Sequence, residues 1–450
     1  MSNNKNILIL GAGKVAGPIV QYFLRQKYRV TVASQYLYEG ELIIENNPLG
    51  EAVECCANDG AKLNSLVRNS NVVVSLLPNK FHHLVCKACI RQKRSLLTPS
   101  YEQPEISLMH SDACKSNITI LNEMGLYPGI DHMWASEIIA EIKARGGKVK
   151  KFISACGALP SPESLDNPFR YKFSWSPKAV MRASSAKASY LKNNIMVELE
   201  PSQLMKNIVA VKIRRLGKLE AHANRNALPY ISLYQIPQVE TFFRGTLRYK
   251  GWCEVIDALI ETGYLSEKPF PEHISNYGDL TAFLGGMENT PNLRDSFARK
   301  LNIKTHSNTI MAMEWIGLFS RSHFNTNLSS PFEVLTNRMA GRIKMLPSDK
   351  DVVVLNQQIL FTLPDGKEKM INAVLTRMGR DDQRTAIADA VSLPTALAAE
   401  MLLHKSIEHK GVIRPVYPDI YQPILKKLRE NFKFRFKETE LDGEKWPKGW

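Results

Sequence analysis

The sequence predicts an α/β fold whose first domain is a doubly wound parallel sheet, followed by a second α/β domain and a small helical subdomain. Two observations predict the first domain. The apolar strand pattern Asn6–Leu10 runs directly into the glycine turn Gly11–Ala16, and a helical pattern and the strand pattern Arg29–Ser34 follow within about thirty residues. Strand and helix patterns then alternate as far as Asn122, which is typical of parallel sheets crossed by helices.

The glycine turn has the spacing of a dinucleotide-binding motif. Gly11 permits the tight turn out of the strand, Gly13 lets the backbone approach a pyrophosphate, and the small Ala16 lets the helix pack closely on the strand. The first N–H groups of the helix then face the phosphates. Because the turn lies between a strand and a helix, it predicts a Rossmann domain that binds NAD or NADP.

Further strands of this sheet end in polar or turn residues. Strand patterns occur at 52–57, 71–77, 95–98 and 118–122. Leu77, Ser100-Tyr101 and Asn122–Gly125 follow three of them, and ligands bind at the carboxyl ends of such strands. The cofactor and substrate site is therefore expected at this edge.

The rest of the chain predicts three bodies. Residues 1–128 form the Rossmann domain, completed by 385–450, where Thr385–Leu403 is an alanine-rich helical pattern. Residues 129–251 and 330–384 form an α/β domain for substrate and dimerisation, with strands at 151–156 and 203–213 and a hairpin across Pro364–Gly366. Residues 252–329 form the helical subdomain, with helices at 253–262 and 307–319.

Composition limits the class of protein. The 450 residues contain no run of eighteen apolar residues and no apolar leader after Met1, so we expect no membrane segment and a cytoplasmic location. The formal charge of +15 is spread along the chain without a nucleic-acid-binding motif, so we expect no nucleic-acid partner. Cys86 and Cys89 have metal or redox spacing, but no second pair follows; we expect no metal site.

The residues after the second strand bear on the choice of cofactor. NAD enzymes usually have Asp or Glu there to bind the ribose hydroxyls, whereas this chain has Ser34-Gln35 and its first acid at Glu39. This favours NADP and leaves NAD as the alternative, because no arginine is present to bind a 2′-phosphate.

A series of motifs in the order of the chain is more specific than the glycine turn. They are Asn122–His132, Ser154–Glu163, Asn167-Pro168, Tyr171–Ser176, Asn224-Arg225 and Arg244–Tyr249. This series resembles saccharopine reductase, the glutamate-forming saccharopine dehydrogenase, and the saccharopine dehydrogenase half of bifunctional aminoadipate-semialdehyde synthase. The resemblance is strongest from Lys5 to about Gly251.

The resemblance implies a reversible hydride transfer at the C–N bond of saccharopine, linking it to glutamate and aminoadipate semialdehyde, in an enzyme of lysine metabolism. We separately expect a homodimer. It implies cofactor contacts at Gly11, Gly13, Lys14, Val15, Ser34, Gln35, Leu77, Ser100, Leu126 and Ser174. It implies substrate contacts at Ser100, Tyr101, Asn224 and Arg225, to which we add Tyr127 and Arg244. Tyr101 and Cys156 correspond to the reaction centre, and Asp131 is a further catalytic candidate.

Residue chemistry supports parts of this interpretation and leaves alternatives open. Saccharopine carries three carboxylates, and the planar forks of Arg225, Arg244 and Arg248 suit oxygen pairs. The alternatives are ion pairing for Arg244 and Arg248 and packing for Tyr101. The alternative role of Cys156 is that of a small buried apolar residue, and the alternative role of Asp131 is that of a helix cap.

Three positions depart from the family pattern. Tyr127 replaces an aspartate, Asn226 replaces a second one, and Ser34-Gln35 lacks an arginine. The losses keep two other hypotheses open. One is a related amine–aldehyde condensation of the carboxynorspermidine dehydrogenase type, which the arginines disfavour. The other is a catalytically silent dinucleotide-binding protein.

Overall fold

The computed structural model describes residues 3–325 and 327–447 and divides into two compact units. The first unit contains the chain up to Gly147 together with Leu375–Arg377 and Gln383–Lys437. The second contains Lys148–Val374, Met378–Asp382 and the chain from Glu438 onward.

The first unit is built on a seven-stranded sheet in the order β15-β6-β5-β4-β1-β2-β3. Every pairing in it is parallel. The strands are β1 (Asn3–Leu10), β2 (Tyr28–Ser34), β3 (Gly50–Glu54), β4 (Val72–Ser75), β5 (Ser95–Leu97), β6 (Thr119–Leu121) and β15 (Gly411–Ile413). Apart from β15, this is the 3-2-1-4-5-6 order of a Rossmann fold, so the predicted doubly wound sheet is confirmed.

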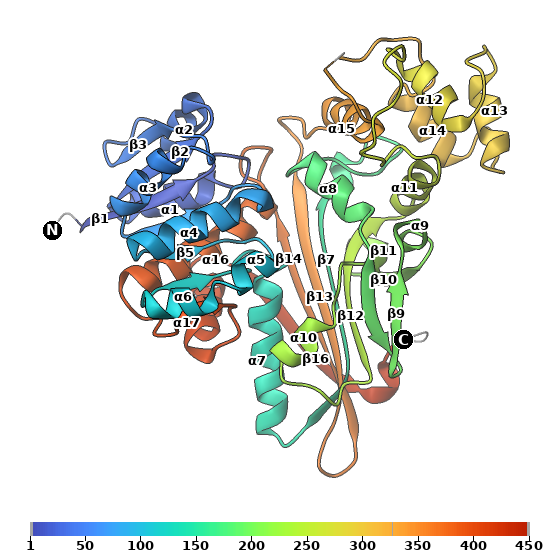
Figure 1. The fold of residues 1–450 in the computed structure, drawn as a ribbon. Coiled ribbons are helices and arrows are strands. Elements are labelled where there is room, and N and C mark those ends of the chain that lie inside the picture. The colour runs from blue at the N-terminus through green and yellow to red at the C-terminus, as the bar shows by residue number, and fades with distance from the viewer. Residues whose placement is uncertain (1–2, 326, 448–450) are drawn as a thin grey trace. The chain divides into compact units, whose positions relative to one another are not determined.

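Helices lie on both sides of this sheet (Figure 1). They are α1 (Gly17–Arg25), α2 (Leu37–Ile44), α3 (Gly60–Arg68), α4 (His82–Gln92), α5 (Pro104–Ser107), α6 (His110–Lys115), α7 (Ile130–Ala144), α16 (Ala386–Leu403) and α17 (Pro418–Glu430). A short 3-10 turn, η1 (Asn79–Phe81), precedes α4. Ile7 to Leu10 of β1 are at most 2% exposed, because this central strand is covered on both faces.

Helix α16 fills the core of the first unit from the far end of the chain. It begins after Thr385, whose side chain caps it by accepting from Ala388 N, and it packs on α1 and β4. Its length and apolar composition would suit a membrane span, but 78% of the segment is buried inside the fold. Its apolar character is thus explained by packing.

The second unit is built on a nine-stranded mixed sheet in the order β10-β11-β12-β7-β13-β14-β16, with β8 paired to β12 and β9 paired to β8. The strands are β7 (Lys148–Pro160), β8 (Ala188–Lys192), β9 (Ile195–Leu199), β10 (Ile208–Ile213), β11 (Gly217–Ala223), β12 (Thr241–Tyr249), β13 (Asp351–Thr362), β14 (Glu368–Met378) and β16 (Arg435–Asp442). β7 runs parallel to β12 and antiparallel to β13. β13 and β14 neighbour each other, as the predicted hairpin requires.

Except for α10, the helices of the second unit share one hydrophobic core with its sheet. They are α8 (Pro177–Ser184), α9 (Pro201–Leu204), α10 (Pro229–Leu233), α11 (Trp252–Glu261), α12 (Tyr277–Gly285), α13 (Leu293–Lys300), α14 (Asn308–Trp315) and α15 (Pro331–Arg342); η2 (Pro162–Ser164) and η3 (Gly443–Lys445) are 3-10 turns. Phe297 and Met313 belong to the same buried cluster as Leu247 of β12. Residues 252–329 are thus helical but do not form a body of their own.

The observed boundaries differ from the predicted ones at three places. The first unit extends to Gly147 instead of residue 128, because α7 packs against α17. The chain from Glu438 onward belongs to the second unit, although the sequence placed 385–450 in the first. The segment 203–213 is not one strand, since Glu200 and Gln203 form a capping box that starts α9.

Candidate functional site

The glycine turn at the end of β1 leaves room for a phosphate group. Gly11 has a φ of +102°, and a Cβ added there would lie 3.3 Å from the carbonyl carbon and oxygen of Leu76. A Cβ at Gly13 would meet nothing within 4 Å, so this stretch of backbone is open. Ala16 caps α1 without a side-chain hydrogen bond, which leaves the first N–H groups of the helix for a ligand. The turn therefore fits a dinucleotide pyrophosphate.

Three further predicted cofactor contacts lie around this turn. Lys14 is exposed and Val15 is half-buried, beside the open backbone of Gly13. Leu77 lies next to Gly11, because its Cδ2 is 3.5 Å from the position of an added Cβ. These residues come from β1, α1 and β4, at the point where the strand order of the sheet reverses.

The end of β2 carries a carboxylate that the sequence alone did not place. The Ser34 hydroxyl is buried and donates a hydrogen bond of 2.5 Å to Glu39 Oε2, while Gln35 is exposed. Glu39 lies in the first turn of α2, so the short loop brings it back to the strand end. The adenosine ribose of a dinucleotide is bound at this strand end in Rossmann domains.

Ser100 and Tyr101 lie just beyond β5, at the same edge of the sheet. Ser100 N donates to Thr98 Oγ1 at 3.2 Å, and Ser100 O accepts from Glu123 N at 3.0 Å. The Ser100 hydroxyl lies 2.8 Å from Nε2 of His82. The main chain and the side chain of Ser100 are therefore both held in place.

Glu123 is a buried acid whose carboxylate bonds to the main chain directly after Tyr101. It is 1% exposed; its Oε1 accepts from Glu102 N at 3.1 Å and its Oε2 lies 2.7 Å from His132 Nε2. Arg414 Nε lies 3.6 Å from the same carboxylate. Burial alone would raise the pKa of Glu123, but the hydrogen bond with His132 and the Arg414 charge outweigh it and lower that pKa.

Asp131 has a local structural role. Its Oδ1 accepts a hydrogen bond of 2.6 Å from Gly129 N at the start of α7, and its side chain is completely buried. This favours the capping interpretation over the catalytic one, because the carboxylate is directed at its own helix terminus. Leu126 is buried and Tyr127 is half-buried, with a cis peptide bond between Tyr127 and Pro128.

The predicted residues of the second unit lie on neighbouring strands of its sheet. Cys156 on β7 is 5% exposed and stands opposite Thr246 of β12. Arg244 on β12 is 1% exposed, and its guanidinium carbon lies 4.2 Å from the centre of the Tyr230 ring. A guanidinium held against an aromatic ring has little freedom to move, which suits the binding of a carboxylate ligand.

Arg248, in contrast, is a packing residue. Its guanidinium carbon lies 5.0 Å from the Tyr171 ring and 5.5 Å from the Trp252 ring, and Nη1 donates to Leu247 O. Stacking on these two rings takes the place of the ion pairing that the sequence left open as an alternative role for Arg248.

The loop after β11 orders the remaining substrate candidates. Asn224 N donates to Arg244 O at 2.9 Å, and Arg225 is exposed with a φ of 55°. Asn226 Oδ1 accepts from Ser189 Oγ at 2.8 Å and from Leu228 N at 3.0 Å. An aspartate would accept the same two hydrogen bonds. Asn226 can therefore fill the structural role of the family's aspartate at this position.

Ser174 is the predicted cofactor contact in the second unit. Its hydroxyl is buried, and among the residues that the structure describes it has no hydrogen-bond partner. In the first unit the buried amide of Asn122, just after β6, likewise has no partner within the described chain. Buried polar atoms of this kind are normally satisfied by water or ligand.

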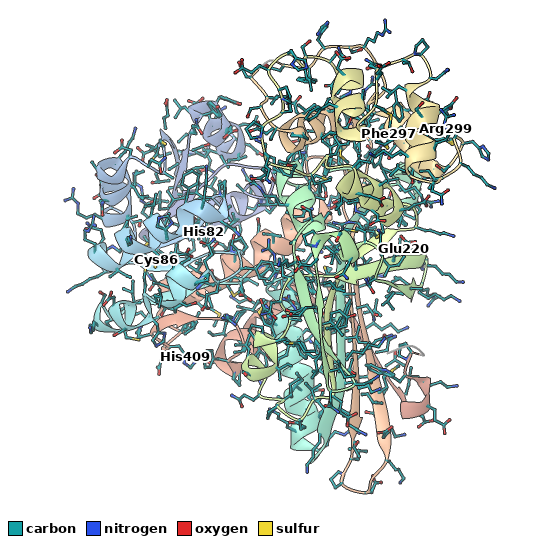
Figure 2. The ribbon with its side chains drawn as sticks, turned by 45° about the vertical axis from the view of Figure 1, so that its right-hand side comes forward. His82, Cys86, Glu220, Phe297, Arg299 and His409 are labelled. Atoms are coloured by element: carbon teal, nitrogen blue, oxygen red, sulfur yellow. The ribbon has the colours of Figure 1, made fainter. Side chains whose placement is uncertain are left out.

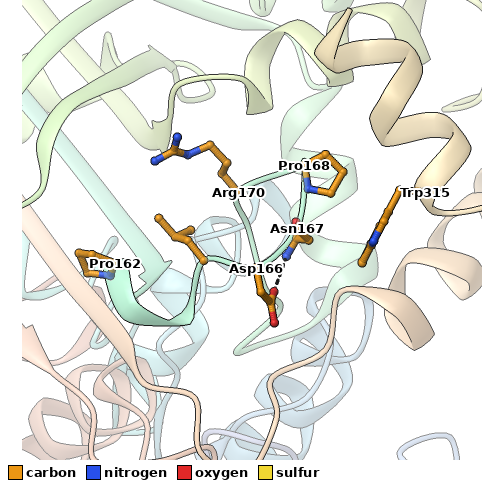
Figure 3. Close-up of a pocket in the computed structure, with 7 residues that line it drawn as sticks. Pro162, Asp166, Asn167, Pro168, Arg170 and Trp315 are labelled. Atoms are coloured by element: carbon orange, nitrogen blue, oxygen red, sulfur yellow. Dashed lines mark hydrogen bonds between the residues drawn. The ribbon is translucent and has the colours of Figure 1, made fainter. Parts of the chain in front are cut away.

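An open pocket of about 570 Å³ lies in the second unit beside η2 (Figure 3). It is lined by Pro162, Leu165, Asp166, Asn167, Pro168, Arg170 and Trp315. Asp166 also forms an ion pair of 2.7 Å with Lys172. Among the described residues that line this pocket, none is a predicted cofactor or substrate contact.

The structure thus gathers the predicted residues into two sets, one in each unit. One edge of the first sheet holds Gly11, Gly13, Leu77, Ser34 and Ser100. In the second sheet, Cys156 lies on β7 and Arg244 lies on β12, and the loop after β11 holds Asn224 and Arg225. His82 is not among the predicted residues, although its burial has a signal in the sequence. His82, Val85, Cys86 and Cys89 repeat at the helical spacing of a buried face.

Comparison with known proteins gives two family matches that together cover most of the chain. Residues 7–121 match the saccharopine dehydrogenase NADP binding domain, and residues 125–433 match the saccharopine dehydrogenase C-terminal domain.

Curated relatives match nearly the whole chain. The chain is 32% identical to saccharopine dehydrogenase [NADP(+), L-glutamate-forming] of Saccharomyces cerevisiae, over 97% of this chain and 99% of that protein. It is 32% identical to the mitochondrial alpha-aminoadipic semialdehyde synthase of Bos taurus over 95% of this chain, but it spans only 47% of that relative. The chain thus has about half the length of the animal relatives.

A solved structure agrees in fold over the same length. The apo saccharopine dehydrogenase (L-Glu forming) from Saccharomyces cerevisiae superposes with a TM-score of 0.88 at 30% identity. It covers 97% of this chain and 100% of the other.

Proposed function

Because the chain belongs to the saccharopine dehydrogenase family, we propose that it oxidises and forms saccharopine with NADP as cofactor. In the oxidative direction, saccharopine, NADP⁺ and water give glutamate, aminoadipate semialdehyde, NADPH and a proton. The hydride leaves the carbon of the C–N bond, and water then hydrolyses the resulting imine. This reaction belongs to lysine metabolism.

The observation that carries the proposal is the match over nearly the whole length to fungal enzymes of this one activity, both units included. The site geometry agrees with it. The glycine turn accepts a pyrophosphate, and the second unit presents Arg244 and Arg225 for a substrate that has three carboxylates.

We assign roles to individual residues on this basis. NADP, when bound, accepts or donates the hydride. Tyr101, which follows β5 at the cofactor edge, exchanges a proton with the reacting nitrogen. Cys156 borders the reaction from β7, and Arg225 and Arg244 bind substrate carboxylates.

A steady-state assay tests the proposal. Purified protein with saccharopine and NADP⁺ is expected to form NADPH, followed at its absorbance maximum, and to form glutamate in equal amount. NAD⁺ and a polyamine-derived carboxylate serve as the competing cofactor and substrate. NADPH binding without turnover of any of these would support the silent dinucleotide-binding protein instead.

Tyr127 gives the first prediction. Tyr127→Asp is expected to raise kcat with saccharopine by about a hundredfold, because a positioned acid or base contributes roughly that much or more. Tyr127→Phe is the matched control and should bring no gain, since it adds no carboxylate. Equal rates for the two variants and the parent protein would show that this chain does not need the family's aspartate.

Two further expectations belong to the same proposal. We propose a cytoplasmic homodimer, as expected from the sequence. Light scattering coupled to gel filtration gives the mass in solution, and a mass of about 50.8 kDa would show a monomer.

A further inference from the structure

A buried histidine joins two strand ends at the edge where the cofactor turn lies. His82 is the first residue of α4, and its side chain is fully buried (Figure 2). Its Nδ1 lies 2.9 Å from Ser75 Oγ at the end of β4, and its Nε2 lies 2.8 Å from Ser100 Oγ after β5. The imidazole therefore bridges two serine hydroxyls across two strand ends.

The bridge has a fixed chemistry. Burial lowers the pKa of His82 to about 4, so the ring is neutral at physiological pH. A neutral imidazole has one N–H donor and one lone-pair acceptor, and each of them faces one serine. Thr98 Oγ1, at 3.4 Å from Nε2, is a weaker third neighbour. In either tautomer, the ring therefore donates a hydrogen bond to one of the two hydroxyls, Ser75 or Ser100, and accepts one from the other.

The side chain of Ser100 depends on this contact. The two main-chain hydrogen bonds of Ser100, to Thr98 and from Glu123, fix its backbone but leave the side-chain rotation open. Among the described residues, His82 is the partner whose bond holds the hydroxyl itself. A small displacement of a positioned group from its productive geometry can cost a hundredfold in rate.

We infer that His82 is a positioning residue for the reaction, which fixes the orientation of the Ser100 hydroxyl. The inference rests on the proposed function, because that function makes Ser100 a cofactor and substrate contact. His82 does not touch the reacting atoms in this assignment; it acts through Ser100.

Two substitutions separate the two sides of the ring. His82→Gln places an amide where Nε2 was and can still bond Ser100, whereas His82→Asn keeps a group near Nδ1 and loses that bond. We expect His82→Gln to keep kcat within about threefold and His82→Asn to lower kcat by about tenfold or more, with the KM for saccharopine changed less. His83→Ala, at the neighbouring half-buried histidine, is the control and should keep the parent rate.

The link through Ser100 has its own measurements. Ser100→Ala and His82→Asn together should lower kcat no further than Ser100→Ala alone, because both remove one interaction. Ser100→Ala in a protein labelled with ¹⁵N-histidine should shift the Nε2 resonance of His82 and leave His83 unchanged.

The outcomes distinguish this inference from the proposed function. Equal loss of kcat in His82→Gln and His82→Asn, additive losses with Ser100→Ala, or an unchanged Nε2 resonance would each overturn the positioning role. An inactive parent protein would overturn the proposed function instead. The resonance experiment then still decides whether the bond between His82 and Ser100 exists.

Discussion

Glu39 places a negative charge at the end of β2, where its carboxylate accepts the Ser34 hydroxyl at 2.5 Å. The sequence showed an acid slightly too late in the chain to bind a ribose. The structure explains the difference, because Leu37 and the following residues begin α2 at once and turn Glu39 back toward the strand. The charge therefore lies beside the position where Rossmann domains bind the adenosine ribose, and it opposes a 2′-phosphate.

Removal of this charge should change the choice of cofactor. Glu39→Gln is expected to raise the ratio of kcat/KM for NADP to that for NAD by about tenfold, which corresponds to about 1.4 kcal/mol of repulsion relieved. Glu41→Gln, an exposed acid of the same helix, is the control. The same ratio in both variants would remove Glu39 from cofactor discrimination.

The contacts of two charged residues, Asp131 and Arg248, were not predictable from the sequence. Asp131 is a catalytic candidate within the motif Asn122–His132, but its Oδ1 accepts a hydrogen bond from Gly129 N. Arg248 was chosen as a substrate fork, but Tyr171 and Trp252 enclose it. Whether a charged group faces a ligand or a neighbour depends on contacts between segments far apart in the chain, and a local pattern does not contain them.

The elements of the first unit were predictable because their signals are local. An apolar strand followed by a glycine turn and an amphipathic helix specifies β1 and α1 by itself, and the later strands repeat that pattern. The second unit was less predictable. Its helices have ordinary helical signals, but only the shared buried cluster shows that they pack on the sheet.

Helix α16 connects these local elements to the site. Thr395 Oγ1 donates to Met124 O at 2.8 Å, and the Ser392 hydroxyl donates to Val15 O in the glycine turn. One helix from residues 386–403 therefore holds two turns that follow β1 and β6. Sequence patterns predicted this helix, but not the carbonyl groups it would bond.

Loss of the Thr395 hydroxyl should loosen the turn after β6. Thr395→Val is expected to lower the free energy of unfolding by about 1–3 kcal/mol, because the Met124 carbonyl stays buried without this donor. Thr336→Val is a matched control: that buried hydroxyl donates only within α15, to Phe332 O and Glu333 O. Urea unfolding compares the two, and equal effects would deny α16 a bracing role.

At the scale of the whole molecule, two buried histidines make stability depend on pH. Burial lowers the pKa of His82 from 6.5 to about 4, and burial together with the Arg248 charge lowers that of His222 to about 3. Between the folded and unfolded pKa values the unfolded chain binds more protons. Stability is therefore complete above pH 6.5 and declines as the pH falls toward 4.

The expected slope is about 1.4 kcal/mol per pH unit for each histidine. Urea unfolding at several pH values between 4.5 and 6.5 measures it, and His82→Gln should reduce the slope by the share of one proton. A parent protein with flat stability across this interval would contradict the neutral burial of both rings.

The division of the first unit along the chain has a consequence for its biosynthesis. Its sheet lacks the edge strand β15 and its core lacks α16 until residues 383–437 have been translated, roughly 235 residues after Gly147. At about 5–20 residues per second, the ribosome needs on the order of 10–50 seconds for that interval. During this time the nascent cofactor domain exposes the apolar surface of α1 and β4 that α16 later covers, and the edge of β6 stays unpaired. The amino-terminal domain, although its synthesis begins first, is thus completed only when nearly the whole chain has been made, and chaperone contact is expected on that surface during this interval.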